Sequence, residues 1–200
     1  MTHLLYLVRH GEQQDAEYGV DDGPLSPRGV RQATAIAERL SGVPFTAAYH
    51  SPLQRAEETA RLMKERLTGV DFEPSSLLMD CVPSGPCDET PSSLRPFFTG
   101  VTEAELEAGS AQMTDAIATW IRPSHEEAHE LLVTHNFVIS WFVRHVMGAP
   151  NWQWMSLNQA NAGLTIIRLR SDRPAQLVTH NDLGHLPPEA RTGLPVPQSF

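Results

Sequence analysis

The chain has little of what several common classes of protein require. Among its 200 residues there are two cysteines, Cys81 and Cys87, and they lie in one segment. Two cysteines are too few for a disulfide framework or for a four-ligand zinc site of the usual kind. We therefore expect both thiols to stay reduced.

Positive charge is also in deficit. The chain has 15 Lys and Arg against 24 Asp and Glu, which gives a formal net charge of −9. Nucleic acids and anionic membranes bind basic surfaces, so neither is expected as a partner. Any site for an anion must be built locally from a few converging cations.

Long hydrophobic runs are missing as well. The apolar run at residues 4–8 is too short for a signal peptide, and the longest later run, at 137–143, is broken by Ser140 and far too short to span a membrane. No internal repeat or linker is evident. We therefore predict a cytoplasmic protein with a single domain over residues 1–200, a length that buries a sizeable core.

Segments with strand character alternate with segments of helical periodicity. The expected strands cover residues 3–9, 45–50, 72–78, 130–135, 162–170 and 174–180, and the expected helices cover 27–41, 51–67, 102–122 and 136–148. This alternation predicts an α/β fold, a three-layer αβα sandwich with a mostly parallel sheet flanked by helices. In such sheets, ligands bind beyond the carboxyl ends of the strands.

The first two helices are each expected to begin at a Ser-Pro pair. Ser26 is predicted to be an N-cap with Pro27 at the first helical position, and Ser51 and Pro52 stand at the head of the second helix. The side chains expected to face the core are Val30, Ala33, Ala37 and Leu40 on the first helix and Ala56, Thr59, Ala60, Met63 and Leu67 on the second.

The segment at 80–100 is expected to be irregular. It contains four prolines and shows little periodicity. Long irregular segments of a compact domain are usually functional or mobile. We expect this segment and the loop at 12–24 to determine substrate selectivity.

Side chains that could bind an anion stand just after the predicted strands. Arg9 and His10 follow the first strand, Arg55 lies in the first turn of the second helix, and His135 ends the fourth strand. These groups should converge at one edge of the sheet, near helix N-termini whose free N–H groups favour anions. The planar fork of arginine matches phosphate oxygens, so the predicted occupant is a phosphoryl group.

Gly11, which has no Cβ, lets a ligand or another backbone come close.

Each of these residues has a simpler interpretation when it is taken alone. An arginine at a strand end is usually part of a surface ion pair, and a single histidine is more often structural than catalytic. The recurrence of such residues at the same kind of topological position is what favours a site.

Four motifs, LVRHGE, LSPRGVRQA, HSPLQRAEETA and LLVTHN, resemble in sequence and order those of the histidine phosphatase (phosphoglycerate mutase-like) superfamily. The resemblance covers nearly the whole chain. RHG alone would be weak, but RHG together with SPLxRAxxT is highly specific. The resemblance implies that His10 is the phosphorylated nucleophile, that Arg9, Arg55 and His135 bind the phosphoryl oxygens, and that no cofactor is needed. Asn136 stands where the superfamily usually has a small residue, and we take it as a further phosphate-binding residue.

The chemistry is consistent with this resemblance. Neutral imidazole is a competent nucleophile near pH 7, and transfer first to histidine and then to water replaces one difficult step by two easier ones. Fixed cations around the phosphoryl oxygens stabilise the transition state. The predicted mechanism is therefore metal-independent.

The general acid for the leaving oxygen is predicted to be Asp80. Its context, LLMDCVP, and the later SLNQANAGLTII and NDLGHLPPEAR resemble the branch of the superfamily that contains a mitochondrial phosphoglycerate-mutase-like Ser/Thr phosphatase, where a Glu stands in place of Asp80. Aspartate is shorter by one methylene, and the alternative is an ordinary turn residue. The next candidates for the acid are Glu12, Glu17, Asp88 and Glu89.

The stretch HEEAH, from His125 to His129, matches the H-E-x-x-H signature of zinc peptidases. That motif needs a helix, so that both histidines share one face, and a third ligand. Here it follows Pro123 and runs directly into a predicted strand. We interpret it as a solvated connector and expect no metal site.

The sequence therefore predicts a phosphomonoester hydrolase. Its substrate would be a phosphorylated small molecule or a phosphoprotein, and a homodimer is one option for its assembly. Two alternatives stay open. One is phosphoglycerate mutase-type phosphoryl transfer. The resemblance disfavours it, because the chain is compact and its segment at 80–100 looks like that of the phosphatase branch, whereas mutases of the superfamily typically carry a longer insertion there. The other is a phospho-ligand binding module with weak catalysis, which would keep the cations but tolerate loss of Asp80.

Overall fold

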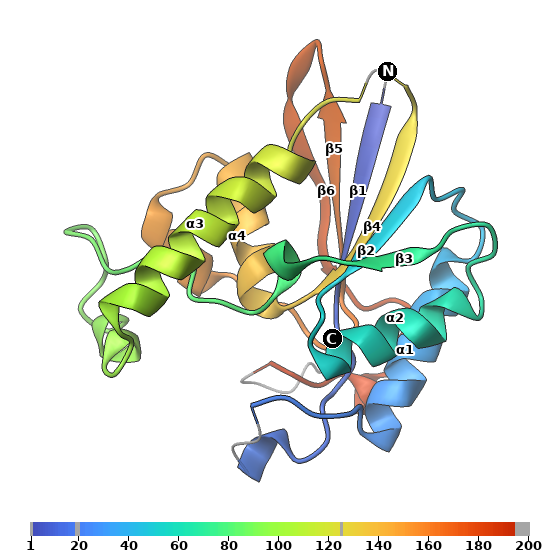
Figure 1. Cartoon of the computed structure of the whole chain (residues 1–200), viewed down its shortest axis with the longest axis horizontal. Coiled ribbons are helices and arrows are strands. Elements are labelled where there is room, and N and C mark those ends of the chain that lie inside the picture. The colour runs from blue at the N-terminus through green and yellow to red at the C-terminus, as the bar shows by residue number, and fades with distance from the viewer. Residues whose placement is uncertain (1, 19–20, 125, 195–200) are drawn as a thin grey trace.

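The computed structural model describes residues 2–18, 21–124 and 126–194. Within them, six strands form one sheet in the order β3-β2-β4-β1-β5-β6 (Figure 1). The strands are β1 (Thr2–Arg9), β2 (Ala47–His50), β3 (Phe72–Pro74), β4 (Ala128–Thr134), β5 (Leu164–Arg170) and β6 (Arg173–Asp182).

The strands that carry the site run parallel to one another. β4 pairs in parallel with both β1 and β2, and β3 pairs in parallel with β2. At the other side of the sheet, β5 is antiparallel to β1 and β6 is antiparallel to β5. The mostly parallel sheet expected from the sequence is confirmed. Since β1, β2 and β4 are neighbours with one direction, their carboxyl ends meet at one edge.

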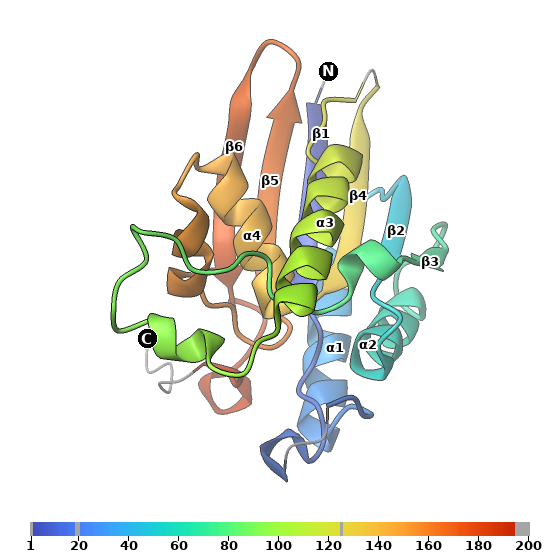
Figure 2. The same ribbon diagram turned by 60° about the vertical axis from the view of Figure 1, so that its left-hand side comes forward.

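Helices cover both faces of the sheet and complete three layers (Figures 1 and 2). They are α1 (Pro27–Leu40), α2 (Gln54–Lys64), α3 (Glu103–Trp120) and α4 (Asn136–Val146). Successive side chains of a strand point to opposite faces. In β1, Tyr6 and Val8 accordingly pack with residues of α1 and α2, whereas Leu5 and Leu7 pack with residues of α3 and α4. This two-sided burial explains the unbroken apolar run of β1.

Three details differ from the expectation. Val30 is 40% exposed and does not face the core. The third strand ends at Pro74, because proline has no N–H for the sheet, and a short 3₁₀ helix at Ser76–Leu78 follows. The second helix begins at Gln54 and not at Ser51, and its N-cap, Leu53, provides no side-chain cap. By contrast, Ser26 caps α1 as predicted, by accepting a hydrogen bond from the backbone of Gly29.

The segment at 80–100 is irregular, as expected, apart from a 3₁₀ helix at Arg95–Phe98. Aromatic contacts attach it to the rest of the molecule. The Phe97 ring lies 5.6 Å from that of Phe137 on α4 and 5.8 Å from that of Trp154, and the Trp154 indole N–H donates to the hydroxyl of Ser84. The segment is therefore held across the end of the sheet beside α4 (Figure 2).

Within the described ranges, no helix is both long enough and apolar enough to cross a bilayer.

Candidate active site

The predicted cationic and imidazole side chains meet at the carboxyl edge of the sheet. His10 follows β1, His135 follows β4, and Arg55 lies in the first turn of α2. Nε of Arg55 lies 3.2 Å from Nε2 of His10, and Nη2 of Arg55 lies 3.2 Å from Nδ1 of His135. The two imidazole rings are 5.0 Å apart between centroids. The arrangement is a compact cluster with Arg55 at its centre.

The hydrogen bonds of His10 determine which ring nitrogen can react. Nδ1 lies 2.7 Å from the carbonyl oxygen of Gly11, and a carbonyl accepts only, so Nδ1 carries the proton. The lone pair is then on Nε2, beside Arg55. Burial lowers the pKa of His10 well below its usual value, and the positive charges of Arg9 and Arg55 lower it further. His10 is therefore a neutral imidazole, and its Nε2 lone pair accepts a hydrogen bond from Nε of Arg55.

Gly11 lets two backbones approach each other closely. A Cβ at Gly11 would lie 2.6 Å from the carbonyl oxygen of Gly29, and one at Gly29 would lie 2.2 Å from that of Glu12. The sequence suggested that Gly11 allows close approach of either a ligand or another backbone. The structure shows the approach of another backbone. The N-terminus of α1 thereby rests against the end of β1 and fixes the position of His10.

Arg9 is anchored by backbone carbonyls from distant parts of the chain. Its Nη1 donates to Gln159 O at 2.6 Å and to Gly193 O at 2.8 Å. Burial lowers its pKa to about 10, against the attraction of Asp80, so the guanidinium is still charged at neutral pH. Its Nε is buried and has no hydrogen-bond partner among the described residues. A buried donor without a partner is costly.

His135 is oriented by Ser51, which sequence reasoning had placed at the head of a helix. Because Nδ1 of His135 accepts from Arg55, its Nε2 carries the proton and donates to the Ser51 hydroxyl at 2.8 Å. Burial lowers the pKa of His135 well below its usual value, with further contributions from His10, Arg55 and Arg9. Ser51 directly follows a strand, as His10 and His135 do. This shared position was the feature of the sequence from which its place in the site could have been predicted.

Asp80 lies at the entrance to the cluster. One carboxylate oxygen is 3.5 Å from Nη2 of Arg55 and 3.9 Å from Nδ1 of His135, and the side chain is 41% exposed. Desolvation raises the pKa of Asp80 above its usual value, and the charges of Arg55 and Arg9 oppose this rise without cancelling it. The group can therefore retain a proton at a higher pH than an ordinary aspartate does, as a general acid requires.

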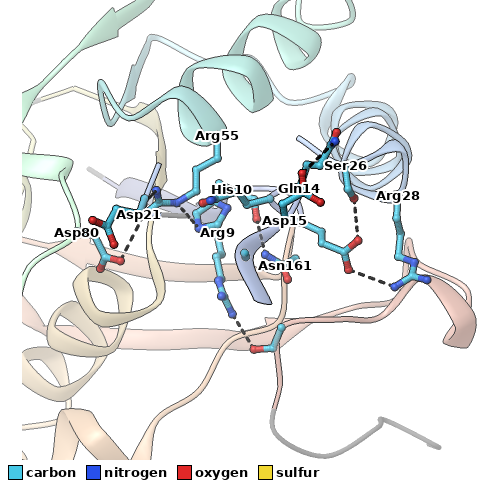
Figure 3. Close-up of a pocket in the computed structure, with 14 residues that line it drawn as sticks. Arg9, His10, Gln14, Asp15, Asp21, Ser26, Arg28, Arg55, Asp80 and Asn161 are labelled. Atoms are coloured by element: carbon cyan, nitrogen blue, oxygen red, sulfur yellow. Dashed lines mark hydrogen bonds and ion pairs between the residues drawn. The ribbon is translucent and has the colours of Figure 1, made fainter. Parts of the chain in front are cut away.

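A cleft of about 690 Å³ opens in front of His10 (Figure 3). Its walls come from residues 12–16 and Asp21, from the start of α1 and of α2, from Asp80, and from Asn161 and Gly193. The lining residues are Arg9, His10, Glu12, Gln13, Gln14, Asp15, Ala16, Asp21, Ser26, Arg28, Arg55, Asp80, Asn161 and Gly193. Arg9, His10, Arg55 and Asp80 are thus accessible from the cleft, whereas His135 is buried and does not line it.

Asn136 lies elsewhere than the sequence suggested. It is the first residue of α4, but its amide bonds Asn158 and the backbone N–H of Gln159, at 3.3 Å and 2.8 Å, and it does not line the cleft. Sequence reasoning also missed Asn161, whose amide donates to the backbone oxygen of His10 at 3.2 Å. Nothing in its local sequence indicates this contact.

The other candidates for the acid are placed less suitably than Asp80. Glu12 lines the cleft, but it accepts from the Ser26 hydroxyl at 2.7 Å and from Arg28 at 3.2 Å. Asp88 and Glu89 are exposed and do not line the cleft, and the side chain of Glu17 lies outside the described part of the structure.

The H-E-x-x-H stretch does not form the helix that zinc binding would need. His129 belongs to β4, where its Nδ1 pairs with the Tyr6 hydroxyl at 3.2 Å, and His125 lies outside the described residues. Within the described ranges, no group of three or more His, Cys, Asp or Glu is arranged to hold a metal ion.

Cys81 and Cys87 are both free thiols, and burial raises the pKa of Cys81 to about 12.

Asp22 is a further residue that sequence reasoning missed, and it positions Arg55. One carboxylate oxygen accepts from Nη1 of Arg55 at 3.1 Å, and the other accepts from the backbone N–H of Gln54 at 3.0 Å. The same carboxylate therefore caps the N-terminus of α2 and fixes the guanidinium. Its Asp-Gly-Pro context indicated only a turn.

We expect Asp22→Asn to lower kcat/KM by roughly tenfold, because the amide can still cap α2 but Arg55 loses a charge-assisted bond. The measurement is turnover of nitrophenyl phosphate, with urea unfolding to follow stability. Asp71→Asn is the control, since Asp71 also pairs with a cation of α2, Lys64 at 2.6 Å, but far from the cleft. Equal kcat/KM in the two variants would contradict this role.

The chain matches a known family over most of its length. The family described as "Histidine phosphatase superfamily (branch 1)" matches residues 5–81 and 95–183. The rat and human proteins named "Serine/threonine-protein phosphatase PGAM5, mitochondrial" are each 28% identical to it, over 96% of the chain and 66% of their own length. The chain thus spans slightly less than two thirds of these curated relatives.

The fold also matches solved structures. The structure described as "a putative alpha-ribazole-5'-P phosphatase" from Escherichia coli str. K-12 substr. MG1655 superposes with a TM-score of 0.72 at 22% identity. The alignment covers 90% of this chain and 97% of that one. At this identity the likeness establishes the shared fold alone.

Proposed function

The chain belongs to the histidine phosphatase superfamily, and on this premise we propose that it is a phosphomonoester hydrolase that acts through a phosphohistidine intermediate on His10. The observation that carries the proposal is the state of His10. Its Nδ1 is committed to the Gly11 carbonyl, and its Nε2 lone pair lies in the cleft, beside the guanidinium of Arg55 and near that of Arg9. A neutral nucleophile among fixed cations is suited to attack on a phosphoryl group.

In the first step, the Nε2 lone pair of His10 forms a bond to phosphorus and the bond between phosphorus and the ester oxygen breaks. Asp80, in its protonated form, gives its proton to the departing oxygen, which leaves as an alcohol. In the second step, the Asp80 carboxylate takes a proton from water as the water oxygen attacks phosphorus. The N–P bond breaks, its electron pair returns to Nε2, and inorganic phosphate is released.

The remaining residues of the cluster bind the transferring group. We propose that Arg9 and Arg55, which both line the cleft, bind the phosphoryl oxygens and stabilise the charge of the transition state. His135 adds a third donor once the incoming phosphate favours its protonation. Asn136 acts indirectly in this proposal, because it holds Gln159, whose carbonyl anchors Arg9.

The substrate would be a phosphorylated small molecule or a phosphoprotein. The cytoplasmic location and the homodimer remain predictions from the sequence, and the PGAM5 relatives are themselves named as mitochondrial.

We also propose that catalysis does not depend on a metal ion, because the arginines supply the positive charge that stabilises the transferring phosphoryl group. Turnover of nitrophenyl phosphate is expected to persist in EDTA, and vanadate, which mimics the phosphoryl group, is expected to inhibit competitively. The measurement is initial rate with and without each reagent, with magnesium and zinc added back after chelation. Activity that disappears in EDTA and returns with zinc would overturn this part of the proposal.

A further inference from the structure

A second cavity, of about 630 Å³, lies on the far side of Asp80 from His10, between the start of the segment at 80–100 and α3. It shares Asp80 and Asp21 with the cleft described above. We propose that this cavity receives the alcohol part of the substrate and that it selects phosphomonoesters whose alcohol carries no negative charge. This inference rests on the proposed function and names its class of substrate.

The position of Asp80 connects the two cavities. In an in-line displacement the leaving oxygen lies opposite the attacking Nε2 of His10. For Asp80 to protonate that oxygen, the oxygen must lie within hydrogen-bond reach of its carboxyl group. Figure 3 shows Asp80 and Asp21 together at the edge of the cleft, beside the end of Arg55. The carbon chain of the alcohol therefore continues past these carboxylates into the second cavity.

The charge of the second cavity is negative. Its described lining includes the carboxyl groups of Asp21, Asp80 and Glu105 and no Lys, Arg or His. When Asp80 carries the proton that it donates, the negative charge is that of Asp21 and Glu105. An amide could have bound a carboxylate, but Gln112 already donates to the backbone oxygens of Leu77 and Met79, at 3.2 Å and 2.8 Å.

The arginines of the first cleft do not offer a second anion site either. Arg28 is paired with Glu12 at 3.2 Å, and Arg55 contacts Asp22 and Asp80, at 3.1 Å and 3.5 Å. Arg55 and Arg9 are needed by the phosphoryl group itself. A substrate with a carboxylate or a second phosphate would place that group among carboxylates.

The rest of the second cavity suits an uncharged or cationic organic group. Phe137 and Val82 supply an aromatic ring and an aliphatic side chain, and Glu105 lies exposed at α3, where it can attract an ammonium group. Phosphoglycerates and bisphosphates, the substrates of a mutase, carry the wrong charge for this lining. The geometry thus favours hydrolysis of neutral or cationic esters over mutase-type transfer.

The test compares three 2-arylethyl phosphates that differ in one para substituent: a carboxamide, an aminomethyl group or a carboxylate. The ester oxygen has nearly the same reactivity in all three, so differences report the binding of the alcohol part. We expect kcat/KM for the carboxamide and aminomethyl esters to exceed that of the carboxylate ester by roughly threefold or more, the scale of a charge repulsion between solvent-exposed groups.

Glu105→Gln locates the effect in the second cavity. Glutamine can still accept the hydrogen bonds from Thr102 that cap α3, while the charge is lost. The ratio of the aminomethyl to the carboxylate ester should fall by roughly threefold or more. Glu107→Gln, on the same helix and outside the cavity lining, should leave the ratio unchanged.

The outcomes separate the inference from the function on which it rests. Turnover of nitrophenyl phosphate with equal or better use of the carboxylate ester would overturn the inference and leave the proposed function standing. An unchanged ratio in Glu105→Gln would overturn the assignment of the cavity. Failure to hydrolyse any phosphomonoester, nitrophenyl phosphate included, would overturn the proposed function and the inference with it.

Discussion

His10→Ala is expected to lower the turnover of nitrophenyl phosphate by roughly 10⁴-fold or more, the scale on which removal of a covalent nucleophile acts. The fold should persist, because His10 has its side chain at the end of β1, beyond the packed interior of the sheet. Arg9, Arg55 and His135 would still bind phosphate in this variant, so affinity for vanadate should fall much less than turnover.

The intermediate gives a more direct measurement. Brief incubation of the wild-type chain with a labelled phosphomonoester should leave an acid-labile, alkali-stable phosphoryl group on His10. Because Nδ1 is committed to the carbonyl of Gly11, the phosphoryl group should be on Nε2, which ³¹P–¹H correlation of the phosphoenzyme can decide. Phosphate found on Nδ1, on serine or on His135 would refute the mechanism.

His50 provides a matched control. It also stands at the end of a strand, is 8% exposed against 6% for His10, and has its Nδ1 bonded to the next residue's carbonyl oxygen at 2.8 Å. His50 does not line the cleft. His50→Ala removes a comparable imidazole and should still form the phosphoenzyme on His10. A loss of label in both variants would indicate damage to the sheet edge and not removal of the nucleophile.

Asp80→Asn is expected to lower the turnover of alkyl phosphates by roughly a hundredfold or more, the usual scale for a positioned proton donor. The loss on nitrophenyl phosphate should be much smaller, because nitrophenolate is stable without a proton. The comparison holds where phosphorylation of His10 limits both rates. Arg9, Arg55 and His135 act on both substrates alike, so their contribution cancels in the ratio.

Comparing the pH dependence of the wild-type chain with that of Asp80→Asn tests whether Asp80 donates the proton. The pKa of Asp80 is raised by desolvation, and only the protonated form can donate, so kcat/KM for alkyl phosphates should fall as pH rises through that pKa. The pKa of His10 is lowered well below its usual value, so the nucleophile stays neutral into the acid range. The activity of the wild-type chain on alkyl phosphates should therefore decline as Asp80 loses its proton, and Asp80→Asn should not show this decline.

Two results would contradict the role of Asp80. Equal losses on alkyl and nitrophenyl phosphates would mean that Asp80 shapes the loop at the cleft and does not donate a proton. Full activity on both would transfer the role to another acid, and Glu12 is then the candidate that lines the cleft.

The sequence by itself determined the layers of the fold and the positions of the main site residues. The continuous apolar run of β1 and the helical periodicity of α1 and α2 are local patterns, and they predict burial of the strand on both faces and of each helix on one face. Arg9, His10 and His135 could be predicted to converge because parallel neighbouring strands end at the same edge, a rule that needs no coordinates. The resemblance in the motifs around His10 and Arg55 then indicated the chemistry.

Only the tertiary structure decided how these residues act. The reactive nitrogen of His10 depends on the carbonyl of Gly11, and the orientation of Arg9 depends on the carbonyls of Gln159 and Gly193, about 150 and 184 residues away. The sequence placed Ser51 only at the head of a helix, but its hydroxyl accepts from His135 as well as from the backbone N–H of Leu53. Hydrogen bonds between distant segments and the charge lining a cavity depend on relative position in space, and local sequence patterns carry no record of that position.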